Sequence, residues 1–208
     1  KSFIAVPTTS GTGSEVTSFA VLTDSETQIK YPLVDDAVLP DEALLTPLFV
    51  KTSPPNVTAF SGMDVLVHAL EAYVATAANN FTDALAQQAI ELVFGYLPKC
   101  HKPTATEHDR MSMHEASCLA GLSFNRAGLG IVHAMAHQLG GQFHVPHGLA
   151  NSMLLPYVIA FNCSRNPAVA KKYAHLSAKL GFAGHNVSEA DKLAALIEAI
   201  VTLQHTLD

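Results

Sequence analysis

Histidine is the residue type that stands out in this sequence. The 208 residues include 11 histidines against 12 lysines and arginines combined. His133 and His137 lie four residues apart, and His144 and His147 follow in a loop expected just beyond a Gly-Gly pair. Neutral imidazole is the commonest metal ligand in proteins, and it also transfers protons near neutral pH. This stretch is therefore the first place to look for chemistry.

A second pair of polar residues has the same spacing. Asp64 and His68 lie four residues apart, so one face of a helix would present both side chains to the same point. An isolated pair of this kind is usually an ordinary surface ion pair. Here the flanking residues of 63–70 are apolar nearly all round, which predicts a buried helix where unpartnered polar groups are costly. A shared metal ion would satisfy both clusters.

Spacing alone leaves two questions open. It does not choose among His133, His137, His144 and His147 as ligands, and it does not exclude a hydrolytic zinc site. The HExxH pattern of zinc proteases and the GxSxG pattern of serine hydrolases are both absent from the sequence.

A loop of small residues, Pro7–Glu15, follows a predicted strand at 3–6. Backbone amides and hydroxyls in such a loop can bind phosphate or ribose oxygens. An ordinary β-turn explains Gly11 and Gly13 equally well, and the GxGxxG pattern is missing.

The elements that must position these residues change character along the chain. The first 50 or so residues are rich in Thr, Val, Pro and Asp, with strands predicted at 3–6 and 19–22, and Ser53–Asn56 marks a boundary. Beyond it the pattern is helical, so we predict a mainly α protein with a small β-rich N-terminal part. The predicted helices are 57–77, 82–97, 107–123, 128–140, 167–180 and one from Ser188 onward.

Composition narrows the class of partner. With 49% hydrophobic and 14% charged residues the chain can bury a substantial core, and its formal charge of −6 without a basic cluster argues against nucleic acid. No apolar run approaches the roughly 20 residues of a membrane helix. Three widely spaced cysteines make a poor disulfide framework, which favours the reducing cytoplasm. We expect a small-molecule substrate.

Three segments together carry a resemblance to a known family. They are PTTSGTGSEVT at 7–17, GMDVLVHALEAY at 62–73, and NRAGLGIVHAMAHQLGGQFHVPHG at 125–148 with LANSMLLP after it. In order and spacing they resemble the iron-containing (group III) alcohol dehydrogenases, above all those of ethanolamine utilisation and of bifunctional aldehyde/alcohol dehydrogenases. The resemblance implies a dehydroquinate synthase-like fold. Residues 1–52 would be the remnant of an α/β dinucleotide-binding domain, and 53–208 an α-helical metal-binding catalytic domain.

The resemblance also implies roles for single residues. His137 would lie beside the nicotinamide, and His144 would have a supporting or structural role. The implied ligands of Fe(II), with Zn(II) as the other option, are Asp64, His68, His133 and His147. The implied NAD(H) contacts are Thr8, Thr9, Thr17, Val21 and Lys30, and the implied substrate pocket includes Phe19 and Phe124.

The function implied is interconversion of a short-chain primary alcohol, ethanol first, and its aldehyde with NAD(H), the metal polarising the substrate oxygen. We expect a homo-oligomer in the cytoplasm, or within a bacterial microcompartment. Family members are about twice as long and open with a GGGS phosphate-binding turn, so we expect this chain to begin inside a longer protein and to bind NAD poorly alone. The rival interpretations are a zinc-dependent glycerol dehydrogenase, a dehydroquinate synthase, and a truncated, catalytically silent helical scaffold.

Overall fold

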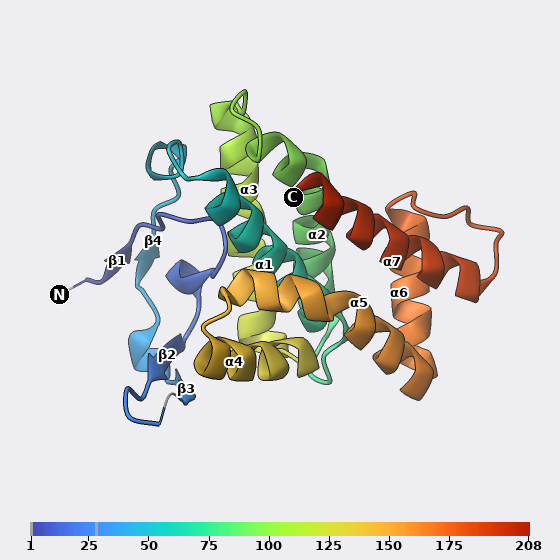
Figure 1. Cartoon of the computed structure of the whole chain (residues 1–208), viewed down its shortest axis with the longest axis horizontal. Coiled ribbons are helices and arrows are strands. Elements are labelled where there is room, and N and C mark those ends of the chain that lie inside the picture. Colours follow the sequence, from blue (N-terminus) through green and yellow to red (C-terminus); the bar gives the residue numbers. More distant parts are fainter. Residues whose placement is uncertain (1, 28) are drawn as a thin grey trace.

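The computed structural model describes residues 2–27 and 29–208, and its helical part follows a short β-rich part (Figure 1). The predicted mainly α architecture is confirmed. The elements in chain order are β1 (Ile4–Ala5), η1 (Ser14–Val16), β2 (Phe19–Thr23), β3 (Lys30–Val34), η2 (Asp36–Val38), β4 (Glu42–Ala43), η3 (Pro47–Phe49), α1 (Pro55–Val74), α2 (Asn80–Cys100), α3 (Glu107–Ala127), α4 (Ile131–Phe143), α5 (His147–Arg165), α6 (Pro167–Lys179) and α7 (Glu189–Thr206).

Helix α1 is the centre of the molecule. It packs against α2, α3 and α5, and Figure 1 shows it in the middle of the helical part. Val65, Leu66, Val67, Ala69 and Leu70 are all fully buried. A helix that is apolar on every side finds neighbours on every side, as its composition predicts. Polar side chains on α1 are therefore held in a rigid, dry setting.

The N-terminal part forms two small sheets. β1 pairs in parallel with β4, and β2 pairs antiparallel with β3, with Val21 opposite Pro32. The strand predictions at 3–6 and 19–22 match β1 and β2, whereas β3 and β4 had no clear sequence signal. The Pro in β3 is one reason, because proline lacks the N–H that a strand ladder uses.

The glycine-rich loop between β1 and β2 packs tightly on the helices. Gly13 has φ 59°, and a Cβ at this position would lie 2.8 Å from the Cα of Gly121 in α3. A Cβ at Gly11 would lie 2.8 Å from the Cβ of Ser61 in α1. Both glycines therefore serve close packing of the loop onto α1 and α3.

Six of the seven α-helices in the described part of the chain lie close to the predicted ranges, but α5 was not predicted. His147 is consequently the first residue of a helix and not part of a loop. Pro156 obscured the pattern, because proline inside a helix leaves the carbonyl four residues earlier without its N–H partner. In the fold, that carbonyl, of Ser152, accepts a hydrogen bond of 2.6 Å from Gln204 Nε2 of α7.

Among the described residues, no helix combines the length and the apolar character needed to cross a membrane.

Candidate metal centre

Helix α1 supplies the first two polar side chains of the centre. Asp64 and His68 lie one turn apart, and only 4% and 5% of their surfaces are exposed. The His68 ring stacks between two other rings, with centroids 4.5 Å from Phe124 and 4.5 Å from His133. Stacking on both faces fixes the plane of the imidazole, so its Nε2 is aimed at Asp64.

Helices α4 and α5 bring two more histidines to the same point. His133 lies in the first turn of α4, and His147 begins α5. The residue after His147 explains how α5 comes so close to α1. A Cβ on Gly148 would lie 2.0 Å from the carbonyl oxygen of Phe60, so only glycine permits this approach. His147 thereby reaches Asp64.

The ligand-type atoms of these helices converge. Asp64 Oδ1 lies 3.5 Å from His133 Nε2, 3.6 Å from His147 Nε2 and 4.0 Å from His68 Nε2. One ligand atom from each of Asp64, His133 and His147 lies within 4.8 Å of the others. Four ligands at about 2.1 Å from a tetrahedral ion are separated by roughly 3.4 Å, so these distances fit a shared divalent cation.

The electrostatics of the cluster follow from burial and from mutual contacts. Burial lowers the pKa of His68 to about 4, although Asp64 opposes the shift, so the ring is neutral. Burial disfavours ionised Asp64, but the neighbouring imidazoles, His68 first and then the hydrogen-bonded His133, hold its pKa well below the ordinary value. Burial likewise disfavours protonated His133, but hydrogen bonds to Asp64 and Glu71 raise its pKa to about 9. The cluster thus contains an ionised carboxylate, a neutral His68 and a His133 that readily takes up a proton.

Two further side chains complete the centre, and the sequence analysis missed both. Glu71 Oε2 accepts a hydrogen bond of 2.6 Å from His133 Nδ1. Asn151 Nδ2 donates to Asp64 Oδ1 at 2.6 Å and lies 3.1 Å from His133 Nε2 and 3.2 Å from His147 Nε2. Their spacing was a usable signal: Glu71 shares a helix face with Asp64, and Asn151 follows His147 by one turn.

The two remaining histidines of residues 133–147 differ in position. His137 faces the same centre, with its ring centroid 5.2 Å from that of His147. His144 is exposed and ends α4 in the left-handed conformation, with φ 54°. The structure therefore brings His133, His137 and His147 together and leaves His144 outside.

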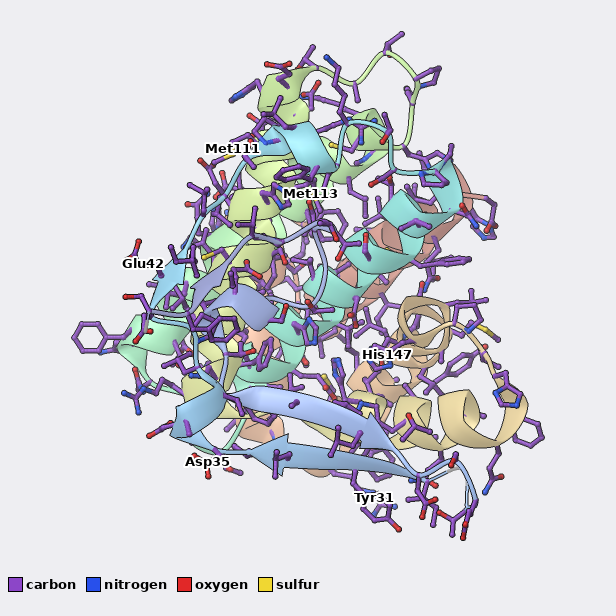
Figure 2. All side chains as sticks on the ribbon, turned by 90° about the vertical axis from the view of Figure 1, so that its left-hand side faces the viewer. Tyr31, Asp35, Glu42, Met111, Met113 and His147 are labelled. Atoms are coloured by element: carbon purple, nitrogen blue, oxygen red, sulfur yellow. The ribbon has the colours of Figure 1, made fainter. Side chains whose placement is uncertain are left out.

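A cavity of about 590 Å³ opens over the centre. Figure 2 shows His147 on this side, with the β2–β3 hairpin marked by Tyr31 and Asp35 below it. Thr8 and Thr9 are not among the residues that line the cavity, and the Lys30 side chain lies outside the described part of the chain. The lining residues are Thr12, Ser14, Thr17, Phe19, Val21, Pro32, Asp64, His68, Phe124, Leu129, Gly130, His133, Ala134, His137 and His147.

Two protein-family models match the sequence of this chain. The family model described as Fe-containing alcohol dehydrogenase family, C-terminal, matches residues 58–208, and the model described as iron-containing alcohol dehydrogenase matches residues 1–47. The chain belongs to the iron-containing alcohol dehydrogenase family. The resemblance inferred from the three sequence segments is thereby confirmed.

Individual iron-containing alcohol dehydrogenases agree with this assignment. The 1-propanol dehydrogenase PduQ of Citrobacter freundii is 53% identical over 201 residues, which cover 97% of this chain and 54% of the relative. A crystal structure of 1,3-propanediol oxidoreductase has a TM-score of 0.92 at 42% identity, covering 98% of this chain and 53% of that one. The sulfoacetaldehyde reductase of Bifidobacterium kashiwanohense in complex with NAD⁺ has a TM-score of 0.86 at 34% identity, covering 98% and 51%.

The chain thus spans about half the length of the relatives that it matches.

Proposed function

We propose that this chain is the metal-binding part of an alcohol dehydrogenase that interconverts a short-chain primary alcohol and its aldehyde with NAD(H). The observation that carries the proposal is the convergence of Asp64, His133 and His147 on one point in the lining of an open cavity. The membership of the family supports it.

The residues that would hold the ion are Asp64, His68, His133 and His147. Three imidazole nitrogens and one carboxylate oxygen suit Fe(II) or Zn(II), and the family favours iron. When bound, such an ion supplies Lewis acidity that polarises the substrate oxygen. The burial of Asp64 and His68 keeps water from the far side of this point, while the cavity leaves its near side open.

The walls of the cavity favour a small apolar substrate. Phe19 and Phe124 meet edge to face with centroids 5.8 Å apart, and Phe124 also covers the His68 ring. Leu129 extends the apolar lining. Such walls exclude water from the reacting carbon and leave no charged partner for a long polar substrate. We therefore propose ethanol or 1-propanol, the second being the substrate named for the PduQ relative.

The proposal for the nicotinamide cofactor rests on other residues of the cavity lining. Thr17 and Val21 line the cavity, and Thr12 and Ser14 add hydroxyl groups to it. The NAD⁺ complex of the sulfoacetaldehyde reductase supports NAD(H) as the cofactor. Contacts from Thr8, Thr9 and Lys30 are proposed from the family resemblance alone.

His137 is proposed to transfer protons in the cavity. It is half-buried, lines the cavity and lies beside His147. A ring nitrogen in this position can take the proton of the substrate hydroxyl and pass it toward water. A homo-oligomeric state and a cytoplasmic or microcompartment location complete the proposal.

The test combines elemental analysis with assays of the purified full-length protein of which this chain is expected to be a part. We expect stoichiometric iron or zinc, NADH oxidation with acetaldehyde or propionaldehyde, and little turnover of glycerol. His68→Ala and His133→Ala should lose metal and activity together, because each removes one of four ligands. Stoichiometric metal in both variants would show that the ligand assignment is wrong, and a preference for glycerol would favour the glycerol dehydrogenase alternative.

A further inference from the structure

Glu71 is a buried acid to which the proposed reaction gives no task. It lies on α1, one turn beyond His68, and its side chain is only 5% exposed. Each carboxylate oxygen has a different partner on α4: Oε2 accepts from His133 Nδ1 at 2.6 Å, and Oε1 accepts from the Val132 backbone N–H at 2.7 Å. We propose that Glu71 is a positioning residue with two linked effects. It holds the N-terminus of α4 in place beside α1, and it determines which nitrogen of His133 faces the metal. This inference rests on the proposed metal centre.

Glu71 Oε2 determines which nitrogen of His133 can bind a metal. A carboxylate that accepts from Nδ1 holds a ring proton there, so Nε2, which faces Asp64 and the centre, is the nitrogen that a metal ion can bind. Asn151 supports the same state, because its Nδ2 can only donate and lies 3.1 Å from His133 Nε2. Without Glu71, the ring could rotate or exchange its proton to Nε2.

Glu71 Oε1 accepts a hydrogen bond at the N-terminus of α4. The cap residue Gly130 has no side chain that could accept from the first N–H groups of the helix. Glu71 Oε1 takes that role from a neighbouring helix, and its negative charge is favourable at a helix N-terminus. A Cβ on Gly130 would lie 2.7 Å from Oε1, so the glycine makes room for the carboxylate.

Both contacts therefore act on the same ligand from opposite ends. Val132 and His133 are adjacent, so any shift of the α4 N-terminus against α1 moves the backbone that carries the imidazole. One carboxylate fixes the backbone and the ring together, which neither a helix cap nor a ring acceptor would achieve alone.

The test compares Glu71→Ala and Glu71→Gln with a cap of similar burial that does not touch the centre. Asp109 accepts from the backbone N–H and the hydroxyl of Thr106 at the start of α3, so Asp109→Ala is the matched control. Affinity for Zn(II) is measured by competition with a chelator. We expect Glu71→Ala to lose on the order of 10- to 100-fold in affinity. Glu71→Gln should lie between, since its amide oxygen can serve only one of the two donors, and Asp109→Ala should match the wild type.

Two further readouts separate positioning from stability. In the Zn(II)-loaded wild type, the His133 Nδ1 proton should give a sharp downfield NMR resonance that weakens in Glu71→Gln and disappears in Glu71→Ala, but persists in Asp109→Ala. Gly130→Ala should lower Zn(II) affinity in the wild type and much less in the Glu71→Ala background, because the two changes affect the same contact.

Equal affinities in the wild type and both Glu71 variants, or an equal loss in Asp109→Ala, would overturn the inference while leaving the metal centre intact. A wild type that binds no Zn(II) would instead overturn the proposed function. The Nδ1 resonance of the metal-free protein would then still report whether Glu71 holds the ring.

Discussion

At the scale of single residues, His137 and His147 have neighbouring rings but are expected to have different tasks. His147 Nε2 lies 3.6 Å from Asp64 Oδ1, whereas His137 lines the cavity with its ring beside that of His147. His137→Ala should therefore keep its metal while the rate falls on the order of 10²-fold, the usual scale for general acid–base catalysis. Elemental analysis with steady-state kinetics measures both effects.

The control for this prediction is His144→Asn. His144 is exposed and has a positive φ that asparagine tolerates, so the rate and the metal content should stay at wild-type values. Loss of metal from His137→Ala would place this residue among the ligands.

Glu15 provides a prediction on pH. It is 3% exposed, no described side chain donates a hydrogen bond to its carboxylate, and burial raises its pKa. A carboxyl group whose pKa is raised by folding destabilises the fold when it is ionised; this cost is full above the folded pKa, shrinks as the pH falls below it, and is gone below the pKa of the unfolded chain. Glu15→Gln should therefore stabilise the protein at neutral pH by about 1 kcal/mol, the scale of a buried group without a partner.

Urea unfolding at a series of pH values checks this. The gain of Glu15→Gln over the wild type should shrink as the pH is lowered, and Glu115→Gln, at an exposed position of α3, should show no gain. A gain that does not depend on pH would assign the effect to packing.

Several residues of the metal centre could be predicted from the sequence. Asp64 and His68 could be predicted because a carboxylate and an imidazole one turn apart on an apolar helix need a common partner. The spacing of Glu71 and Asn151 indicates only that they lie near the ligands; their hydrogen-bond partners could not be predicted, because these contacts join helices far apart in the sequence. Contact of that kind is decided by packing and not by local spacing.

At the scale of elements, the approach of α5 to α1 depends on Gly148. Gly148→Ala would place a Cβ 2.0 Å from the Phe60 carbonyl oxygen, a backbone atom that cannot move aside. The helices must separate, which should cost about 1–3 kcal/mol of stability and weaken metal binding as His147 withdraws. Thermal unfolding and Zn(II) titration measure the two losses.

Gly95 is the matched helical glycine. Nothing lies within 4 Å of a Cβ added there, on the exposed side of α2. Gly95→Ala should therefore stabilise the protein by about 0.5–1 kcal/mol, since alanine loses less backbone entropy on forming a helix. If both substitutions behaved alike, the close approach of α5 would not be the cause.

Helix α5 also marks the limit of prediction from sequence for the elements. Pro156 interrupts its pattern, and the compensation comes from Gln204, some fifty residues away. Strand β3 contains a proline and β4 has only two residues, so local pattern could not identify them. The long helices, in contrast, were placed within a few residues of their observed ends.

At the scale of the whole molecule, the two parts of the chain are unequal in packing. The main buried cluster runs from Ala59 to Leu207 and includes no residue of the first fifty. The N-terminal part is attached through specific contacts, such as Gly13 on Gly121 and Ser18 on Asn125. The division of the chain at residue 52 stays a prediction.

The limited packing of α4 affects local opening of the folded protein. Among the described residues, α4 packs mainly against α5, and its polar contacts with α1 are made by two adjacent residues, Val132 and His133. An element that packs mainly on one neighbour is expected to open locally before the whole protein unfolds. An ion bound by α1, α4 and α5 together would close that opening, because it binds only the closed form.

Amide hydrogen exchange would reveal this coupling. Saturating Zn(II) should slow exchange of the α4 amides by orders of magnitude, with little change in α7, which contributes no residue to the centre. Uniform slowing of all helices would mean that α4 opens only with global unfolding. The expected pattern would make the opening of α4 the step that sets how fast the protein gains or loses its metal, so that metal could be exchanged in a protein that stays folded.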